Sequence, residues 1–435
     1  MAEQMKPSGI DWIGDIPESW KCSKVKFCFS LVNGSTPESS DYDCWDGDIK
    51  WVTPADMSDT GTISHGERFI TKYGYNSCGT TLLPVGSIVI SSRAPIGKIN
   101  ITTAELCTNQ GCKSLIRYAD NKYFYYLFLA GQNELSLLGR GTTFLELSTY
   151  DLNGFGLVIP AEDEQKVIAD FLDKECAQID SIVADLEKQI ALLQQYKKSL
   201  ITETLTKGLD KSAPMKDSEV EWIGKIPEHW ELKHLKYLAK SILDGAHLTP
   251  TYTDDGIPFL RVTDITSVDG IDAEINLDTV ARISKEEHRI LCQRCHPQKG
   301  DVLVSKNGTI GVPKIIDWDW EFSIFVSLCL IKLNDSLLNK WLFYYFKSTL
   351  VATEIAFAGK TNTITNLHLE KIANFKIPLP SVEEQKLIAT YLDEKVCKID
   401  ALIKEKQSQL ETLRQHKKSL IYEYVTGKKR VKEVR

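Results

Sequence analysis

Residues 160–180 read PAEDEQKVIADFLDKECAQID, and residues 380–400 repeat this stretch as PSVEEQKLIATYLDEKVCKID. The match continues without a gap to residues 206 and 426, and 20 of the 47 aligned positions are identical. Self-similarity at a constant offset indicates an internal duplication. The chain is therefore predicted to consist of two related halves.

A second repeated block opens each half. DWIGDIPESW at 11–20 recurs as EWIGKIPEHW at 221–230, with seven of ten positions identical. Between the repeated blocks only fragments match, such as GSIVISSRAPIG from residue 86 and GDVLVSKNGTIG from residue 300. A shared frame that carries two different inserts predicts two domains that bind related but non-identical targets.

Both copies of the longer block are predicted to form long helices. Each copy follows a proline and has acidic residues in its first turn, where the helix dipole favours negative charge. Ser381 and Glu384 match a capping box, in which the Ser381 hydroxyl accepts from the Glu384 N–H and the Glu384 carboxylate accepts from the Ser381 N–H. Gly208 and Gly427 are natural C-caps. Each helix is expected to run about 45 residues, or roughly 70 Å.

Apolar residues recur along both predicted helices at steps of three and four, as in the seam of a helix pair. The simplest interpretation is an intramolecular pair, and the alternative is a seam that binds another chain. A duplicated chain brings its copies together most simply about a pseudo-twofold axis, with antiparallel helices and one insert domain at each end of a rod. The predicted seam or partner-interface residues are Ile179, Ile182, Leu186, Leu193 and Leu200 in the first helix and Ile399, Leu402, Leu413 and Leu420 in the second.

The two inserts are predicted to be mixed α and β. Short runs rich in branched residues alternate with Gly, Pro, Asn and Asp turns, which is typical of strands. YFYYLFLA and WLFYYF predict one helix in each insert, with the aromatic side chains in the core. The predicted fold class is α+β, with two mixed α/β domains separated by a pair of long antiparallel, coiled-coil-like helices and related by an internal pseudo-twofold repeat.

The composition is that of a globular protein with two or three domains, since 43% of the 435 residues are hydrophobic and 26% are charged. No apolar run approaches the roughly 18 residues of a membrane span, and no secretory signal opens the chain, so a cytoplasmic protein is expected. Eleven scattered cysteines predict reduced, mostly buried thiols. A net charge of −7 argues against nucleic-acid binding by bulk positive charge, so any anion-binding surface must be local.

Motifs for cofactor chemistry are weak. The run CQRCH at 292–296 has the spacing of a haem attachment site, but no export signal accompanies it. A zinc site at Cys292 and Cys295 lacks a second ligand pair with suitable spacing. GKT at 359–361 resembles the end of a P-loop, but Glu354 stands where that motif needs its first glycine. No catalytic constellation stands out, and no metal site is predicted.

Two pairs of polar loops occupy matching places in the halves. LGRGTT at 138–143 corresponds to AGKTNT at 358–363, and the strand-end residues Ser92 and Arg93 correspond to Lys306 and Asn307. Glycine allows close approach of a ligand, Arg or Lys adds charge, and Thr or Asn adds hydrogen bonds. Arg can read guanine and Asn can read adenine. The alternative for any one of these residues is an ordinary solvated turn.

With these residues the chain resembles the DNA-specificity subunits of type I restriction-modification systems. The resemblance covers nearly the whole chain. It rests on the WIGxIPExW openings, on NGSTP at 33–37 followed by WDGDIKWVTPAD, on CTNQG at 107–111, on GRGTTFLELS at 139–148, and on both copies of the helix from EQKxIAxxLD to KKSLI.

The resemblance implies a non-catalytic chain that recognises a bipartite, asymmetric site in double-stranded DNA. Residues 1–159 and 211–379 would be target-recognition domains, each contacting one half-site, and 160–210 and 380–435 would be conserved helical spacers. Two methyltransferase subunits would dock on the helices, and restriction subunits with translocase activity would join that core. S-adenosylmethionine, ATP and Mg would belong to those partners, which are also expected to supply much of the grip on phosphates.

The DNA-contact candidates combine the matched loops with the family-like motifs. They are Thr36, Trp51, Thr53, Ser92, Arg93, Asn109, Gln110, Arg140, Thr142 and Thr143 in the first half and His247, Thr249, Tyr252, Arg261, Thr263, Lys306, Asn307, Lys360, Thr361 and Asn362 in the second.

Two other classes of function compete with this one. A stand-alone methyltransferase is disfavoured because the chain has no cofactor loop and no Asn-Pro-Pro-aromatic motif. A coiled-coil adaptor whose inserts bind protein remains the alternative.

Overall fold

The computed structural model describes residues 4–93, 95–140, 145–268, 270, 273–358 and 366–431. Thr142, Thr143, Lys360, Thr361 and Asn362 lie outside the described residues.

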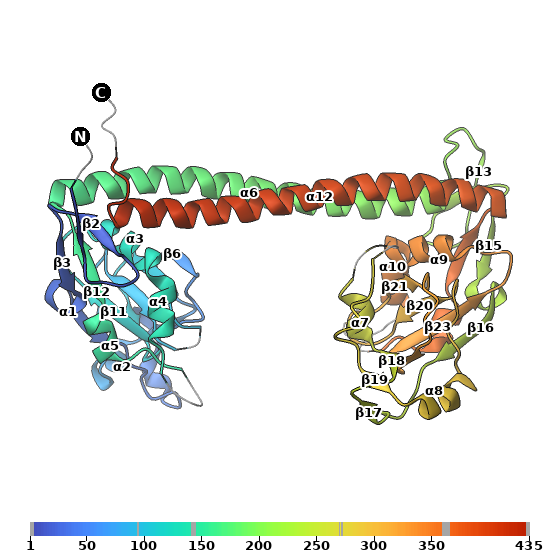
Figure 1. Ribbon diagram of the computed structural model, residues 1–435, viewed down its shortest axis with the longest axis horizontal. Coiled ribbons are helices and arrows are strands. Elements are labelled where there is room, and N and C mark those ends of the chain that lie inside the picture. The colour runs from blue at the N-terminus through green and yellow to red at the C-terminus, as the bar shows by residue number, and fades with distance from the viewer. Residues whose placement is uncertain are drawn as a thin grey trace. The chain divides into compact units, whose positions relative to one another are not determined.

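The chain divides into two compact units. The first unit comprises Met1–Glu187 and Ser408–Arg435, and the second comprises Lys188–Gln407. Each unit therefore combines one globular part with a portion of both long helices (Figure 1). The four-part division predicted from the sequence stays a prediction.

Two long helices follow the repeated blocks, as predicted. Helix α6 spans Glu162–Lys207 and helix α12 spans Val382–Val425, with 46 and 44 residues, and Figure 1 shows both as continuous. Gly208 and Gly427 have φ angles of 71° and 73°, which place them in the left-handed region typical of helix C-caps.

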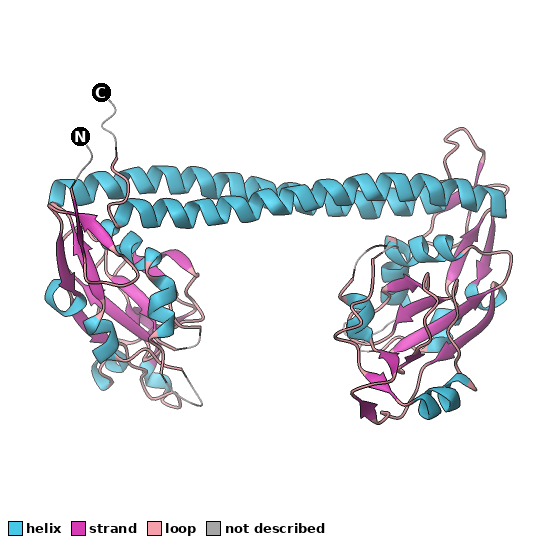
Figure 2. Ribbon diagram, in the orientation of Figure 1, coloured by secondary structure: helices cyan, strands magenta, loops and turns pink. Residues whose placement is uncertain are grey.

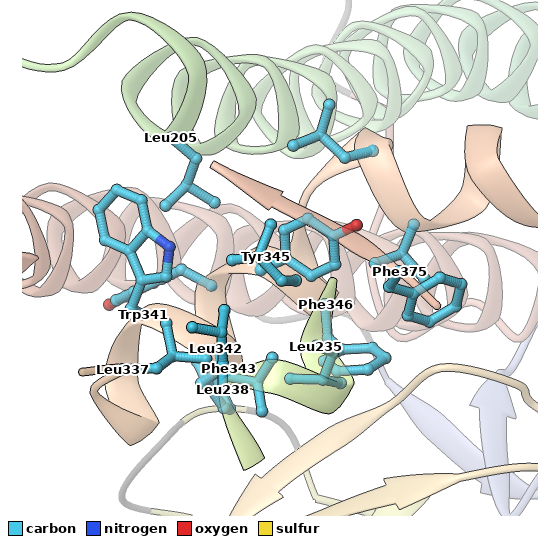
Figure 3. Close-up of a cluster of buried hydrophobic side chains, with 14 of the residues drawn as sticks. Leu205, Leu235, Leu238, Leu337, Trp341, Leu342, Phe343, Tyr345, Phe346 and Phe375 are labelled. Carbon is cyan, nitrogen blue, oxygen red and sulfur yellow. The ribbon is translucent and has the colours of Figure 1, made fainter. Parts of the chain in front are cut away.

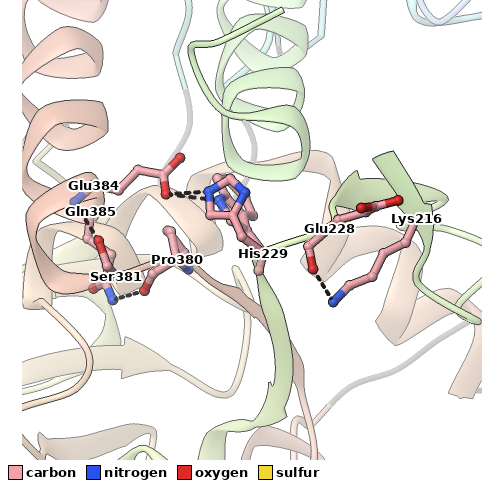
Figure 4. A network of polar contacts seen from close by, with 8 residues as sticks. Lys216, Glu228, His229, Pro380, Ser381, Glu384 and Gln385 are labelled. Atoms are coloured by element: carbon pink, nitrogen blue, oxygen red, sulfur yellow. Dashed lines mark hydrogen bonds and ion pairs between the residues drawn. The ribbon is translucent and has the colours of Figure 1, made fainter. Parts of the chain in front are cut away.

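The start of α12 confirms one half of the predicted capping box and contradicts the other. The Ser381 hydroxyl accepts from the Glu384 N–H at 3.2 Å. The Glu384 carboxylate instead accepts from Trp230 Nε1 at 3.1 Å and lies 3.0 Å from His229 Nε2 (Figure 4). Trp230 is fully buried, so its indole N–H requires an acceptor inside the fold.

The first unit repeats this contact between the two duplicated blocks. Trp20 is also fully buried, and its indole N–H donates to Glu164 of α6 at 3.1 Å. The last tryptophan of each WIGxIPExW block is therefore fixed by the glutamate in the first turn of a long helix.

In each unit the two long helices run antiparallel. In the first unit Lys417 bonds to Asp180 at 2.6 Å and Arg414 bonds to Glu187 at 2.8 Å. In the second unit Lys197 bonds to Asp400 at 2.6 Å, and Lys406 donates to the Gln189 side chain at 2.6 Å. Residue numbers fall along one helix as they rise along the other, which confirms the predicted antiparallel pairing.

The inner stripe of the helix pair contains seven of the nine predicted seam residues. Ile182 and Leu402 are 48% and 46% exposed and lie off the seam. Steps of four and three from Ile179 and Ile399 keep the stripe on one face, as heptad packing requires. The residues that occupy it are Ile179, Val183, Leu186, Ile190, Leu193 and Leu200 in α6 and Ile399, Ile403, Leu410, Leu413 and Leu420 in α12.

Each globular part is built on a central sheet whose first four strands have the same order. In the first unit the order is β4-β11-β8-β9-β6, and in the second it is β16-β23-β20-β21. The strands of both globular parts are magenta in Figure 2. The strands are β4 Ser30–Asn33, β11 Cys112–Ile116, β8 Ile88–Ser91, β9 Ile99–Thr102 and β6 Thr60–Ile63, then β16 Ala239–Asp244, β23 Leu328–Leu333, β20 Val302–Ser305 and β21 Pro313–Ile315.

A smaller sheet in each unit contains one parallel pair at matching places. Strand β5 (Trp45–Val52) pairs with β10 (Cys107–Thr108), and β18 (Ile257–Leu260) pairs with β22 (Ser323–Ile324). The other strands of these sheets are β7 Arg68–Ile70, β17 Tyr252–Thr253 and β19 Arg282–Ile283.

Two-stranded ladders join the inserts to the repeated blocks. They pair β1 Met5–Pro7 with β2 Asp15–Pro17, β3 Lys21–Lys24 with β12 Gly156–Ile159, β13 Met215–Asp217 with β14 Lys225–Pro227, and β15 Glu231–His234 with β24 Lys376–Leu379.

Short helices complete both units. They are α1 Val25–Cys28, η1 Tyr42–Cys44, α2 Lys72–Ser77, α3 Lys122–Ala130, α4 Gln132–Leu137 and α5 Thr149–Gly154 in the first, and η2 Leu235–Tyr237, α7 Val262–Thr266, α8 Lys285–Cys292, α9 Asn339–Lys347, α10 Thr349–Ala358 and α11 Leu369–Ala373 in the second.

The aromatic helices lie in the cores, as predicted. In the second unit Trp341 and Tyr345 of α9 pack with Leu205 of α6 and with Phe375 (Figure 3). Tyr123 of α3 is equally buried in the first unit. Burying one large apolar side chain contributes about 1.5–3 kcal/mol, so these contacts bind each insert firmly to its helices.

All eleven cysteines are free, as predicted, and six of them are buried. Within the described residues, no helix is long and apolar enough to cross a bilayer.

Candidate nucleic-acid interface

Three polar segments of the first unit meet where strand β8 ends. The Ser92 N–H donates to the Gly111 carbonyl at 2.8 Å, and the Ser92 carbonyl accepts from the Leu147 N–H at 2.8 Å. The strand end, the CTNQG motif and the segment after the Arg140 loop are therefore neighbours, although 19 and 55 residues separate Gly111 and Leu147 from Ser92 in the chain. The sequence analysis matched each loop with its counterpart in the other half. The structure shows in addition that the two loops of the first half are neighbours.

Two arginines lie at this meeting point. The Arg93 Nε donates to the Glu146 carboxylate at 3.3 Å, and the Arg140 Nη2 donates to Asp151 at 3.2 Å. The Arg93 and Arg140 side chains are 50% and 78% exposed. The Arg93 pair is exposed on both sides, and such pairs contribute about 0–1 kcal/mol, so this guanidinium can exchange its carboxylate for another anion at little cost. Asp151, the partner of Arg140, is 8% exposed and also accepts from the Ser148 hydroxyl at 2.6 Å.

The NGSTP motif packs directly on the CTNQG motif. A Cβ at Gly34 would lie 2.0 Å from the Asn109 carbonyl oxygen, so only glycine permits this approach. The Thr36 hydroxyl contacts the Gln110 side-chain oxygen, and Asn109 Oδ1 accepts from the Gly111 N–H at 2.9 Å. Gln110 is exposed, whereas Thr36 and Asn109 are half-buried.

Three other candidates of the first unit have structural partners or are buried. Trp51 is 4% exposed and donates through Nε1 to the Ser35 carbonyl at 3.0 Å. Thr53 donates to Asp56 through its N–H at 2.7 Å and its hydroxyl at 2.6 Å. Ser92 is fully buried, and its hydroxyl has no partner among the described residues.

The second unit repeats this arrangement with different side chains. The Lys306 N–H donates to the Ser327 carbonyl and the Lys306 carbonyl accepts from the Leu367 N–H, both at 2.8 Å. Asn307 forms a backbone bridge with Asn366, at the places that Arg93 and Glu146 occupy in the first unit. The side-chain oxygens of Asn307 and Asn366 are buried without a partner in the described part of the chain.

Lys306 itself is 4% exposed, and its ammonium contacts the Asp244 carboxylate. The exposed imidazole of His247 lies beside the same carboxylate, with 3.7 Å between Nε2 and Asp244 Oδ2. Arg294 Nη2 lies 3.3 Å from the same His247 nitrogen. Two basic side chains, Lys306 and His247, therefore lie beside Asp244 at the end of β16.

The remaining candidates described in the second unit stand close to β17 or β18 in the chain. The Arg261 N–H donates to Asp264 at 2.7 Å, which matches the Thr53 and Asp56 contact of the first unit. Thr249 and Thr263 are exposed, and Tyr252 is 47% exposed.

Several polar residues of these surfaces escaped the sequence analysis. In the first unit Lys113, Asn33, Thr149 and the 86% exposed Tyr150 lie next to the matched loops. A lysine inside the strand CKSLI was the available signal, because a charged residue rarely stands in a buried strand without a reason. The sequence analysis also missed Asp244, Glu146 and Asn366. These residues lie beside the matched loops because of where the strands end, and the sequence does not define the strand ends.

The CQRCH motif of the second unit belongs to no group of three or more potential metal ligands among the described residues. Burial raises the pKa of Cys295 to about 12, so this thiol stays protonated. The Cys292 sulfur lies 3.6 Å from the His288 ring, but no group of three or more potential ligands occurs among the described residues.

Comparison with known proteins assigns the chain to a family. The model of the type I restriction modification DNA specificity domain matches residues 17–192 and again 227–412. The chain belongs to this family. The two matches of the specificity domain family coincide with the two duplicated halves.

Relatives with curated names cover almost the full length of this specificity-domain protein. The MjaIX specificity subunit of a type I restriction enzyme from Methanocaldococcus jannaschii is 27% identical over 97% of this chain and 96% of its own. The EcoBI specificity subunit from Escherichia coli is 28% identical over 93% of this chain and 85% of its own.

A solved structure shares the fold of this family member. It was described as the structural basis of complex assembly and conformational transition of the type I R-M system. The TM-score is 0.68 at 16% identity, over 94% of this chain and 98% of the other.

Proposed function

We propose that this chain is the specificity subunit of a type I restriction-modification complex and that each globular part recognises one half of a bipartite, asymmetric DNA site. The observation that carries the proposal is the matched meeting of loops at the ends of β8 and β20. Equal backbone contacts around Ser92 and Lys306 support different side chains, as two readers of different half-sites require.

The two surfaces offer different hydrogen-bonding chemistry. Arg93 and Arg140 of the first unit offer guanidinium groups, which suit guanine edges and phosphates. The second unit has asparagines at the matching places, Asn307 and Asn366, and an asparagine amide suits adenine rather than guanine. The two half-sites are therefore expected to differ in sequence.

The long helices offer matched surfaces to two copies of one partner. Val167 of α6 and Leu387 of α12 stand at equivalent places in the duplication and are 48% and 66% exposed. Exposed apolar residues at equal places suit a partner that binds twice, and methyltransferase subunits fill that role in this proposal. Restriction subunits would then join the complex.

This chain would be non-catalytic, and the complex would act in the cytoplasm. S-adenosylmethionine, ATP and Mg would be used by the partner subunits. The net charge of −7 supports an arrangement in which the partner subunits make most of the contacts to DNA phosphates and this chain makes the contacts to bases.

Exchange of one insert tests the proposal. Residues 21–157 are replaced by the corresponding insert of a relative, and methylated adenines are mapped in cells that carry the complete complex. One half-site is expected to change while the other stays the same, because each reader rests on its own core.

The matched control exchanges residues 231–379 and is expected to change the other half-site. A change of both half-sites after a single exchange contradicts the two-reader proposal. Methylation that is independent of sequence favours the adaptor alternative.

A further inference from the structure

Lys113 is a buried lysine whose ammonium is hydrogen-bonded only to neutral groups among the described residues. It lies on β11 and is 6% exposed. Its ammonium donates to Asn33 Oδ1 at 2.9 Å and to the Thr149 hydroxyl at 3.1 Å, and both acceptors are neutral. Among the side chains that the structure describes, no carboxylate lies within 4.0 Å of this ammonium. The third ammonium N–H has no acceptor in the same set of residues.

This arrangement is unfavourable for the isolated protein. An unpaired charge loses its hydration on burial, and hydrogen bonds to neutral groups recover only part of that loss. Burial accordingly lowers the pKa of Lys113; the negative charge of Glu146 opposes this shift, and the positive charge of Arg93 adds to it. A strand of a central sheet does not need such a residue for folding.

The second unit shows a compensated buried lysine close to the matching place, but on another strand. Cys329 stands at the place of Lys113, and Lys306 stands at that of Ser92. Asn33 is the last residue of β4 and Asp244 is the last residue of β16, and each precedes a glycine that packs on the facing loop. The Lys306 ammonium contacts the Asp244 carboxylate, and their side chains are 5% and 13% exposed. A carboxylate is therefore compatible with this position, and the first unit has an amide there instead.

The Lys113 ammonium lies at the candidate interface. Asn33 is exposed and adjoins Gly34, which packs on the CTNQG loop, and Thr149 follows the segment that bonds to Ser92. The two neutral acceptors thus hold a positive charge below the surface where the matched loops of the first unit meet.

We propose that Lys113 is a DNA contact of the first unit, whose ammonium donates to an acceptor atom of bound DNA. The inference rests on the proposed function and adds a residue to its reading surface. A phosphate oxygen and the acceptor edge of guanine have the required chemistry. Bound DNA would supply a negatively charged or neutral hydrogen-bond acceptor for the third N–H of the Lys113 ammonium.

The test uses the full-length chain in its complex and a duplex that carries the methylation motif mapped for the wild type. Asn33→Asp gives the first unit the carboxylate of the second and is expected to raise the Tm and to weaken DNA binding. Lys113→Met removes the charge without adding a negative one and is expected to weaken binding while the Tm stays at or above the wild-type value. A charge-assisted hydrogen bond predicts a loss of roughly tenfold to a hundredfold in affinity for each variant.

The type of contact follows from two further readouts. A phosphate contact lowers affinity for all duplexes alike and reduces the slope of log affinity against log salt by about one. A base contact relaxes the preference at one position of the half-site read by the first unit. Lys306→Met is the matched control for the compensated site, and its Tm is expected to fall because Asp244 loses its partner.

Wild-type affinity and preference in both variants overturn the inference. Weaker binding by Asn33→Asp alone also overturns it, because the added carboxylate then acts by repelling DNA. These failures differ from failure of the proposed function, in which the wild-type complex itself shows no dependence on DNA sequence.

Discussion

Arg140 illustrates how a single residue of the candidate interface is held. Its side chain is 78% exposed and bonds to Asp151 through one guanidinium N–H. We expect Arg140→Ala to weaken DNA binding by about 1–3 kcal/mol and to relax the preference at one position if the guanidinium contacts a base. The Tm is expected to change little, because the buried Asp151 carboxylate keeps its hydrogen bond from the Ser148 hydroxyl when the guanidinium is removed. Competition binding against duplexes with single substitutions measures both effects.

Arg140→Lys separates the two types of contact at this residue. Lysine keeps the charge but cannot form a two-pronged hydrogen bond with guanine. A phosphate contact is therefore expected to survive this substitution, whereas a base contact is lost. Unchanged affinity and preference in Arg140→Ala return the loop to an ordinary solvated turn.

Sequence reasoning at the residue scale succeeded where the duplication supplied a comparison. The correspondence of Ser92 with Lys306 is visible in the two related sequences, and the backbone contacts confirm it. The burial of Trp51 and the neutral hydrogen-bond partners of Lys113 were not visible, because both depend on segments distant in the chain. Glu384 is a similar case, since its acceptor role is set by Trp230, 154 residues earlier.

At the scale of elements, the helix pair contains the same ion pair twice. Lys197 bonds to Asp400 in the second unit, and Lys417 bonds to Asp180 in the first, each at 2.6 Å. The lysines stand at equivalent seam positions, with side chains 17% and 25% exposed. Polar groups inside a seam fix the register of paired helices, so these pairs are expected to select the antiparallel alignment.

Charge exchange tests this role. Asp400→Lys faces Lys197 with a like charge and is expected to lower the free energy of unfolding by about 1–2 kcal/mol after allowance for solvent screening. The double variant Lys197→Asp with Asp400→Lys is expected to recover most of that loss. Urea unfolding of the four proteins in the cycle gives the coupling energy.

The pair in the first unit provides the matched control. The same cycle at Asp180 and Lys417 is expected to give a coupling of similar size, because the duplication places both pairs in equivalent surroundings. The absence of coupling in both cycles contradicts a role in register.

The same lysines explain why the predicted stripe was partly wrong. The helices and their glycine caps were predictable, since proline, acidic first turns and apolar steps of three and four are local signals. Lys197, Lys406 and Lys417 occupy seam positions, and a pattern of apolar residues treats them as interruptions. The apolar residues Ile182 and Leu402 filled the apparent gaps, although they lie on the exposed side.

For the whole molecule, the proposed function requires a fixed number of unread base pairs between the half-sites. If the helix pair sets this number, a longer pair must lengthen the gap. The end of α6 is not suited to such a change, because Gly208 caps the helix and packs against Trp230. Residues added after Gly208 extend the exposed linker and leave the helix as it is.

The informative variant adds four residues to each helix, after Glu187 in α6 and after Gln407 in α12, at the boundary between the two units in each helix. Four residues lengthen a helix by about 6 Å and turn it by slightly more than one full turn, and a pair of coiled helices accommodates such an insertion by local unwinding. DNA advances about 3.4 Å per base pair, so the gap in the methylation motif is expected to grow by one or two base pairs while both half-sites keep their sequence.

The control inserts the same residues after Asp210, in the exposed linker, and is expected to keep the wild-type gap. An active complex with lengthened helices and an unchanged gap shows that another contact sets the spacing, and altered bases within a half-site show that the helices form part of the reading surface.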